Sequence, residues 1–152
     1  MTDVPYTELA PPRDLCAYVD RFWVKRMRAP RDRSQRVLPD GCVDLLVDVG
    51  AERSELVGPM TRAHLFPAGA SHVVAVRFKP GAGSRFAGVP LDALADAHAP
   101  VSEVGLIESE IVDNVCGAGD LGACVRALEG LVRRRLETAD APDRLARRAV
   151  LE

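Results

Sequence analysis

The stretch that decides the fold is Ser71–Leu91, which reads SHVVAVRFKPGAGSRFAGVPL. Residues 72–78 are rich in valine and alternate between apolar and mixed positions, which is the pattern of a half-buried strand. Pro80-Gly81 ends that strand, because proline has no N–H for a ladder and glycine accepts a positive φ. After Gly88 the apolar spacing becomes helical. The stretch therefore predicts a junction between a β half and an α half.

Upstream of this junction, short apolar segments recur with turn residues between them. Val43–Val49 (VDLLVDV) is the clearest strand and Gly50 ends it, while Tyr18–Met27 (YVDRFWVKRM) alternates in the same way. Further short strands are expected at 36–38, 55–57 and 64–66. Short strands at roughly 8–12-residue spacing predict an antiparallel sandwich or barrel.

Downstream of the junction, the pattern predicts helices. Pro90 is well placed in the first turn of a short helix, and Ser102 is a credible N-cap for a second. A long helix is expected from about Leu121 to Glu137, and Pro142 is expected to separate it from another helix that begins at Asp143. We therefore expect an α+β fold in one domain of 152 residues, with a β half (1–88) and a helical half (89–152).

Composition narrows the functional class. The chain is 47% hydrophobic and 28% charged with a net charge of −2, which are ordinary values for a globular domain. No apolar run approaches the roughly 20 residues of a membrane span, and no charged-then-apolar leader opens the chain. We expect a cytoplasmic protein with no membrane partner. The four cysteines stand at no zinc spacing and are expected to be reduced, buried thiols.

The charges are segregated along the chain. Residues 88–123 contain seven acids and no Lys or Arg, whereas residues 126–148 contain seven Arg and four acids. Such blocks suggest complementary faces that meet within the domain or in a dimer. Solvated faces that happen to cluster are an equally acceptable interpretation.

The sequence contains no GxSxG, HExxH or P-loop motif of enzyme chemistry. We therefore expect no enzymatic activity, no catalytic residue and no cofactor. The histidines His64, His72 and His98 are scattered, so no metal site is expected, although a Cys/His site of Cys42, His64 and His72 is geometrically possible in a barrel.

The strand 43–49 has a polar face. If its apolar residues pack on one side, Cys42 and Asp44 lie on the other, and an unpaired buried carboxylate is costly. Arg62 and Arg77 are the natural partners, so an internal Asp–Arg pair and a ligand contact both remain open. Trp23, the single tryptophan, suits either a pocket or the core.

A DNA-binding surface would need a recognition helix with a basic face. Arg133-Arg134-Arg135 is the candidate, but no helix-turn-helix pattern surrounds it. A solvated or interface face is the better interpretation of this run.

Three segments together resemble a known family. They are RVLPDGCVDLLVD (36–48), LVGPMTR (56–62) and VRFKPGAGSRFAGVPLDAL (76–94). With them, the chain from Tyr18 to about Leu136 resembles the N-terminal sensor domain of AraC-type (AraC/XylS) bacterial transcriptional regulators.

This resemblance implies a cupin-like β-barrel, or jelly roll, followed by helices that serve in dimerisation. It also implies a small-molecule effector, a homodimer formed through the C-terminal helices, and contact with DNA only through a C-terminal helix-turn-helix domain that is absent from this chain. The resemblance assigns no ligand residues, so the polar set expected to face the barrel is our ligand-binding prediction. That set is Trp23, Asp40, Cys42, Asp44, Arg62, His64 and Arg77.

Two other functions remain open from the sequence. A thiol-based redox sensor would use the cysteines, with Cys116 and Cys124 flanking a glycine-containing turn. A cupin-type metalloenzyme is the weaker alternative.

Overall fold

The computed structural model describes residues 6–27, 35–66 and 71–151. The described chain forms an antiparallel sheet of six strands in the order β1-β2-β7-β4-β5-β8 and a separate ribbon of two strands, β3 and β6. The sheet strands are β1 Thr7–Leu9, β2 Val19–Met27, β4 Asp44–Asp48, β5 Arg53–Val57, β7 Ser71–Phe78 and β8 His98–Pro100; the ribbon strands are β3 Gln35–Val37 and β6 His64–Phe66. An α+β fold, with helices after most of the strands, is confirmed.

The helices follow the junction between the two halves. They are α1 Gly83–Ala87, α2 Leu91–Leu94, the 3₁₀ helix η1 Val101–Val104, α3 Glu108–Cys116 and α4 Leu121–Leu151. The boundary predicted at residue 88 is crossed in both directions, because α1 precedes it and β8 follows it. Three residues of β8 carried no sequence signal, and their pairing with β5 makes them a strand.

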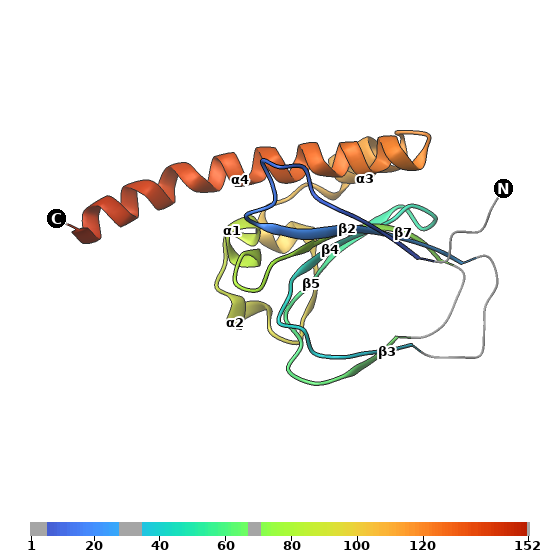
Figure 1. The fold of residues 1–152 in the computed structure, drawn as a ribbon, viewed down its shortest axis with the longest axis horizontal. Coiled ribbons are helices and arrows are strands. Elements are labelled where there is room, and N and C mark those ends of the chain that lie inside the picture. Colours follow the sequence, from blue (N-terminus) through green and yellow to red (C-terminus); the bar gives the residue numbers. More distant parts are fainter. Residues whose placement is uncertain (1–5, 28–34, 67–70, 152) are drawn as a thin grey trace.

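The closed barrel expected from the sequence is wrong for the described residues, because the six-stranded sheet is open. Its two edges are β1 and β8, each three residues long. β8 ends at Pro100, which has no N–H to donate to a further strand. β3 and β6 pair with each other rather than with the sheet. In Figure 1, α4 and α3 lie on one side of the sheet and β3 lies on the other.

The sheet face toward the helices is the hydrophobic core. The strand registers place Phe22, Val76, Leu45 and Leu56 in one row across four strands, and all four are fully buried. Phe86 of α1 stacks on the ring of Phe78 at a centroid distance of 4.7 Å. Buried residues of α3 and α4 complete the core: Ile111, Val115, Cys124, Val125, Leu128, Val132 and Leu136.

The helical half differs from expectation in two places. The helix expected from Ser102 is divided into η1 and α3, because Gly105 takes a left-handed conformation (φ 76°) that ends η1. The last helix continues through Pro142 to Leu151 as one helix of 31 residues. Proline removes one helix hydrogen bond and costs about 3 kcal/mol, which bends or weakens a helix without having to end it. Figure 1 shows the last turns of α4 extending beyond the sheet.

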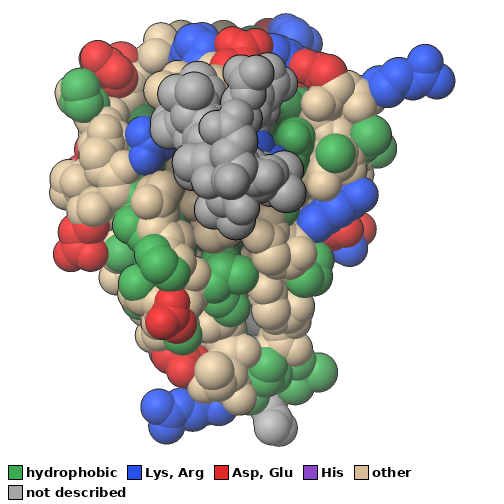
Figure 2. All heavy atoms as spheres, turned by 90° about the vertical axis from the view of Figure 1, so that its left-hand side faces the viewer, with side chains coloured by type: hydrophobic (Ala, Val, Ile, Leu, Met, Phe, Trp, Pro, Cys, Tyr) green, Lys and Arg blue, Asp and Glu red, His purple; other side chains and the backbone are tan. Residues whose placement is uncertain are grey.

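The surface seen from the end toward which α4 points carries both signs of charge. Figure 2 shows acidic, basic and apolar side chains side by side on this face. This mixture agrees with the small net charge of −2.

Candidate functional site

The face of the sheet that points away from the helices carries a polar cluster built on neighbouring strands. Asp44 on β4 lies opposite Arg77 on β7. The Arg77 guanidinium donates from Nε to Asp44 Oδ1 (3.0 Å) and from Nη2 to Oδ2 (3.1 Å). Trp23 of β2 donates its indole N–H to Oδ2 over 3.2 Å. Asp44 is only 8% exposed. Each oxygen of its carboxylate therefore accepts at least one hydrogen bond from a neighbouring side chain.

The turn before β4 brings a second carboxylate toward the same arginine. Asp40 Oδ2 lies 3.7 Å from Arg77 Nη1. The other oxygen of Asp40 accepts the backbone N–H of Cys42 over 3.0 Å, while Gly41 between them has a φ of 70°. This is the side-chain-to-backbone bond that stabilises Asx turns. The Cys42 thiol contacts the carbonyl oxygen of Asp40 at 3.6 Å.

Burial sets the protonation of these groups. It raises the pKa of Asp44, and the hydrogen bonds from Arg77 and Trp23 oppose that rise. Burial alone would lower the pKa of Arg77, but the neighbouring carboxylates Asp44 and Asp40 outweigh it and raise that pKa. Arg77 therefore stays cationic. Burial, reinforced by Asp40, raises the pKa of Cys42 to about 11, so this thiol stays protonated at neutral pH.

Strand β1 adds an aromatic and charged border to the cluster. The Tyr6 ring lies 5.9 Å from the Trp23 ring, tilted by 34°. The Tyr6 hydroxyl donates to Glu8, which also forms an ion pair with Arg21 of β2. Tyr6 is 47% exposed, so this aromatic border is open to solvent.

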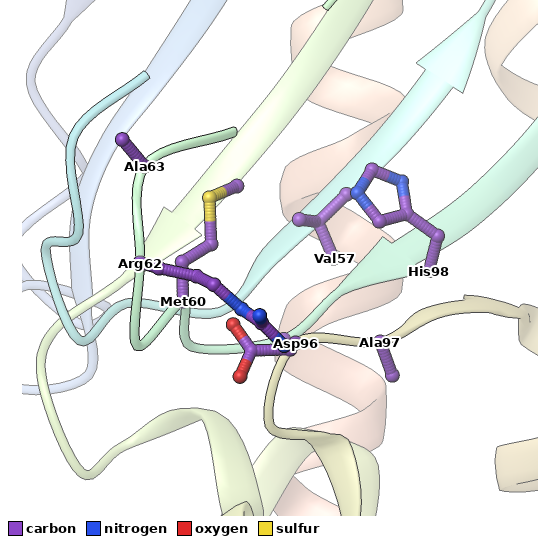
Figure 3. Close-up of a pocket in the computed structure, with 8 residues that line it drawn as sticks. Val57, Met60, Arg62, Ala63, Asp96, Ala97 and His98 are labelled. Carbon is purple, nitrogen blue, oxygen red and sulfur yellow. The ribbon is translucent and has the colours of Figure 1, made fainter. Parts of the chain in front are cut away.

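A cleft lies further along the same sheet face. It has a volume of about 250 Å³ and opens between residues 57–63 and 96–98. Figure 3 shows Met60 and Ala63 on one side, Val57 and His98 on the other, and Asp96 and Ala97 at one end; the Arg62 side chain runs in this view from the side of Met60 toward Asp96. The cleft and the polar cluster are continuous across the sheet, because Asp44 pairs with Val57 and Val57 pairs with His98.

The loops that form the cleft are tied together by backbone and side-chain hydrogen bonds. Gly58 N donates to Ala97 O and Asp96 N donates to Pro59 O, each over 2.9 Å. The Asp96 carboxylate accepts the backbone N–H of Thr61 over 2.9 Å and also its hydroxyl. Asp96 itself has a φ of 55°. A non-glycine residue held in this conformation is strained, and such strain gathers at functional sites.

The seven residues predicted from the sequence separate into two groups. Trp23, Asp40, Asp44 and Arg77 come together, with Cys42 beside them, whereas Arg62 lies in the cleft. His64 is on β6, and its side chain lies outside the described residues. Arg77, one of the two arginines predicted as partners of Asp44, is the partner observed. A contact between Asp44 and a ligand stays a prediction.

Sequence reasoning did not assign the other residues of the cleft. Asp96 and His98 reach it through the segment that leads into β8 and through β8 itself, and the sequence carries no indication that β8 is a strand. Met60 reaches it through the loop after β5, and from the sequence it suits either a pocket or the core. His98 Nδ1 lies 3.7 Å from Glu55 Oε1, across the β5–β8 pair. Within the described ranges, no group of three His, Cys, Asp or Glu side chains lies close enough together to hold a metal ion.

The polar face of the sheet combines an acid–arginine pair with a cleft. Asp44 accepts three hydrogen bonds, two from Arg77 and one from Trp23, which hold its carboxylate in place. The cleft, by contrast, offers a cationic group, an apolar wall and a solvent opening, which is the combination found in small-molecule sites.

Comparison with known proteins places the chain in one family. Residues 7–100 match the family described as Domain of unknown function (DUF6597), so the chain belongs to it. The matched region covers every strand of the sheet, including the polar cluster and the cleft. No curated protein matches the chain significantly. No solved structure matches it significantly either. In the part of the chain that the structure describes, none of the helices is long and apolar enough to cross a membrane.

Proposed function

We propose that this chain is the ligand-sensing and dimerisation part of an AraC-type transcriptional regulator. The observation that carries the proposal is the two-sided sheet. One face is sealed by α1, α3 and α4, while the other carries a half-buried Arg77–Asp44–Trp23 cluster that continues into an open cleft. A sensor needs both: a surface for the ligand and a helical layer that responds to it.

The path from ligand to helices runs through β7. This strand presents Arg77 to the polar face and Val74, Val76 and Phe78 to the core beneath the helices. A ligand that moves Arg77 or its neighbours also alters the packing of the core. Such a ligand shifts the balance between two arrangements of α4 only by the difference in its affinity for them.

The helices offer the surface for dimerisation. A shallow groove of about 100 Å³ lies between α3 and α4 and is lined by Leu106, Ile107, Ala127 and Leu131, among others. Ile107 is 56% exposed and adds a large apolar side chain to this groove, which a partner helix would cover. Glu110 and Arg134 line the same groove with opposite charges, and a twofold contact would bring each near its complement.

Dimerisation is tested by light scattering after gel filtration. Ile107→Glu should weaken the dimer at least tenfold, while Leu121→Glu, at another exposed apolar position on α4 (38%), should leave it unchanged. Equal effects of both variants, or a strictly monomeric wild-type chain at high concentration, would count against this part of the proposal.

The regulatory role is tested on the whole gene product. If a helix-turn-helix domain follows this chain in the reading frame, the full protein should bind DNA upstream of its own gene in gel-shift assays. An effector found by a broad thermal-shift screen should change that binding. A gene product without any DNA-binding domain would refute the proposed function.

A further inference from the structure

We propose that the cleft between residues 57–63 and 96–98 binds small amphipathic carboxylates. The carboxylate pairs with the Arg62 guanidinium, and the apolar part of the ligand packs on Met60 and Val57. Because it names the class of effector, this inference rests on the proposed sensing function.

The first support is that the cleft is rigidly constructed. Four hydrogen bonds join its two loops: Gly58 to Ala97, Asp96 to Pro59, and two from Thr61 to Asp96. Gly58 has no room for a side chain, since an added Cβ would lie 1.7 Å from the Leu94 carbonyl oxygen. A pre-organised cleft spends little ordering entropy on binding.

The second support is the distribution of charge within the cleft. Thr61 donates to both oxygens of the Asp96 carboxylate, which ties the two loops together and holds the negative charge of Asp96 at one end of the cleft. Arg62 is exposed at the rim, and in the part of the chain described here it has no ion pair or hydrogen bond through its side chain. A guanidinium fits a carboxylate with two parallel hydrogen bonds, which makes an organic acid its natural ligand.

The third support is the size and lining of the cleft. The cleft volume of about 250 Å³ is smaller than that of sites for drug-sized ligands, which is about 300–1,000 Å³. The ligand is therefore small. Figure 3 shows the thioether of Met60 and the side chain of Val57 on opposite sides of the cleft. Methionine adapts to varied apolar shapes, and this suits a short alkyl or aryl group.

The test uses matched pairs of probes in calorimetric titration against the chain. Hexanoate and benzoate should bind, whereas hexanamide and benzamide, of the same shape without charge, should bind at least tenfold more weakly. Hexylamine, of the opposite charge, should not bind. Equal affinity for an acid and its amide, or no binding of either acid at millimolar concentration, would overturn the proposal.

Two variants locate the site. Arg62→Gln should weaken acid binding at least tenfold without changing the melting temperature, because the side chain is exposed. Arg126→Gln, an exposed arginine on α4 outside the cleft, is the matched control and should bind as the wild type does. Met60→Ala should weaken hexanoate binding more than acetate binding. Wild-type affinity in Arg62→Gln would refute the assignment.

These outcomes separate the inference from the proposed function. If a full-length regulator binds DNA and responds to another class of molecule while the acids fail, the inference alone is wrong. If the acids bind through Arg62 but the gene product has no DNA-binding domain, the site stands and the proposed function falls.

Discussion

The Arg135 guanidinium on α4 donates from Nη2 to the carbonyl oxygen of Val104, the last residue of η1, over 2.6 Å. The same guanidinium donates from Nε to Phe86 O (2.9 Å) and from Nη2 to Ala87 O (3.4 Å), both in α1. These carbonyls lie at helix ends, where no partner within the helix is available. The Arg135 side chain therefore joins the long helix α4 to the two short helices α1 and η1.

Replacing Arg135 should weaken the attachment of α4 to α1 and η1. Arg135→Met leaves the three carbonyl oxygens without their donors and should lower the free energy of unfolding by about 2–3 kcal/mol. Arg134→Met, at the next position and exposed, should change it by less than about 0.5 kcal/mol. Denaturant unfolding followed by circular dichroism measures both. Equal stabilities of the two variants would show that the hydrogen bonds of Arg135 contribute little.

The Asp44–Arg77 pair should behave as a buried ion pair. Arg77→Met leaves a buried carboxylate without its main partner and should cost about 3 kcal/mol, whereas the double variant Asp44→Leu/Arg77→Met should cost less than this single change. Without Arg77, burial raises the pKa of Asp44 still further. A carboxyl whose folded pKa is raised loses stability as pH rises, so the deficit of Arg77→Met should shrink as pH falls. Additive effects of the two substitutions would contradict this account.

Close packing of the backbone at Gly58 should make it sensitive to a single methyl group. In Gly58→Ala the new Cβ meets the Leu94 carbonyl oxygen at 1.7 Å, and we expect a loss of about 3 kcal/mol. At Gly50 the nearest atom would be Asp48 Oδ1 at 3.5 Å, an ordinary contact, so Gly50→Ala is the matched control. Thermal unfolding of the two variants should differ clearly, and similar melting temperatures would refute the tight approach.

The ion pair between Asp14 and Arg133 joins the segment before β2 to α4. The hydrogen bond from Arg133 lowers the pKa of Asp14. A lowered carboxyl pKa stabilises the fold above the ordinary pKa of aspartate, and this contribution is lost as pH falls through the lowered value. The stability difference between wild type and Asp14→Asn should therefore be present at neutral pH and vanish in acid. A pH-independent difference for Asp14→Asn would contradict the pairing.

The cysteines should react slowly, with one exception. Burial raises the pKa of Cys42 to about 11, and it also raises the pKa of Cys116 and of Cys124. Since the thiolate is the nucleophile, the exposed Cys16 should be alkylated first at neutral pH. Peptide mass spectrometry after timed labelling gives the order. A Cys116–Cys124 disulfide formed under mild oxidation would instead favour a thiol-based sensor.

Parts of the fold could be predicted because their signal is local. The alternation in β4 and β7 and the apolar stripe of α4 reflect the periods of a strand and a helix, which neighbouring residues set. The same alternation placed Asp44 and Arg77 on one face and made their pairing a reasonable expectation. The division into η1 and α3 was missed, since Gly105 stands inside an otherwise continuous apolar period.

The amino-acid sequence by itself determined that the longer segments, such as β2, β4, β7 and the first part of α4, are strands or helices, which of their sides are apolar, and that a buried acid needs an arginine. Tertiary structure decided that the sheet stays open, that β8 exists, and that Arg62 and Asp96 share a cleft beside the Asp44–Arg77 cluster. The reason is that strand order and loop contacts join residues distant along the chain. A three-residue segment such as β8 becomes a strand only because its backbone pairs with another strand, and its own sequence is too short to show a strand period.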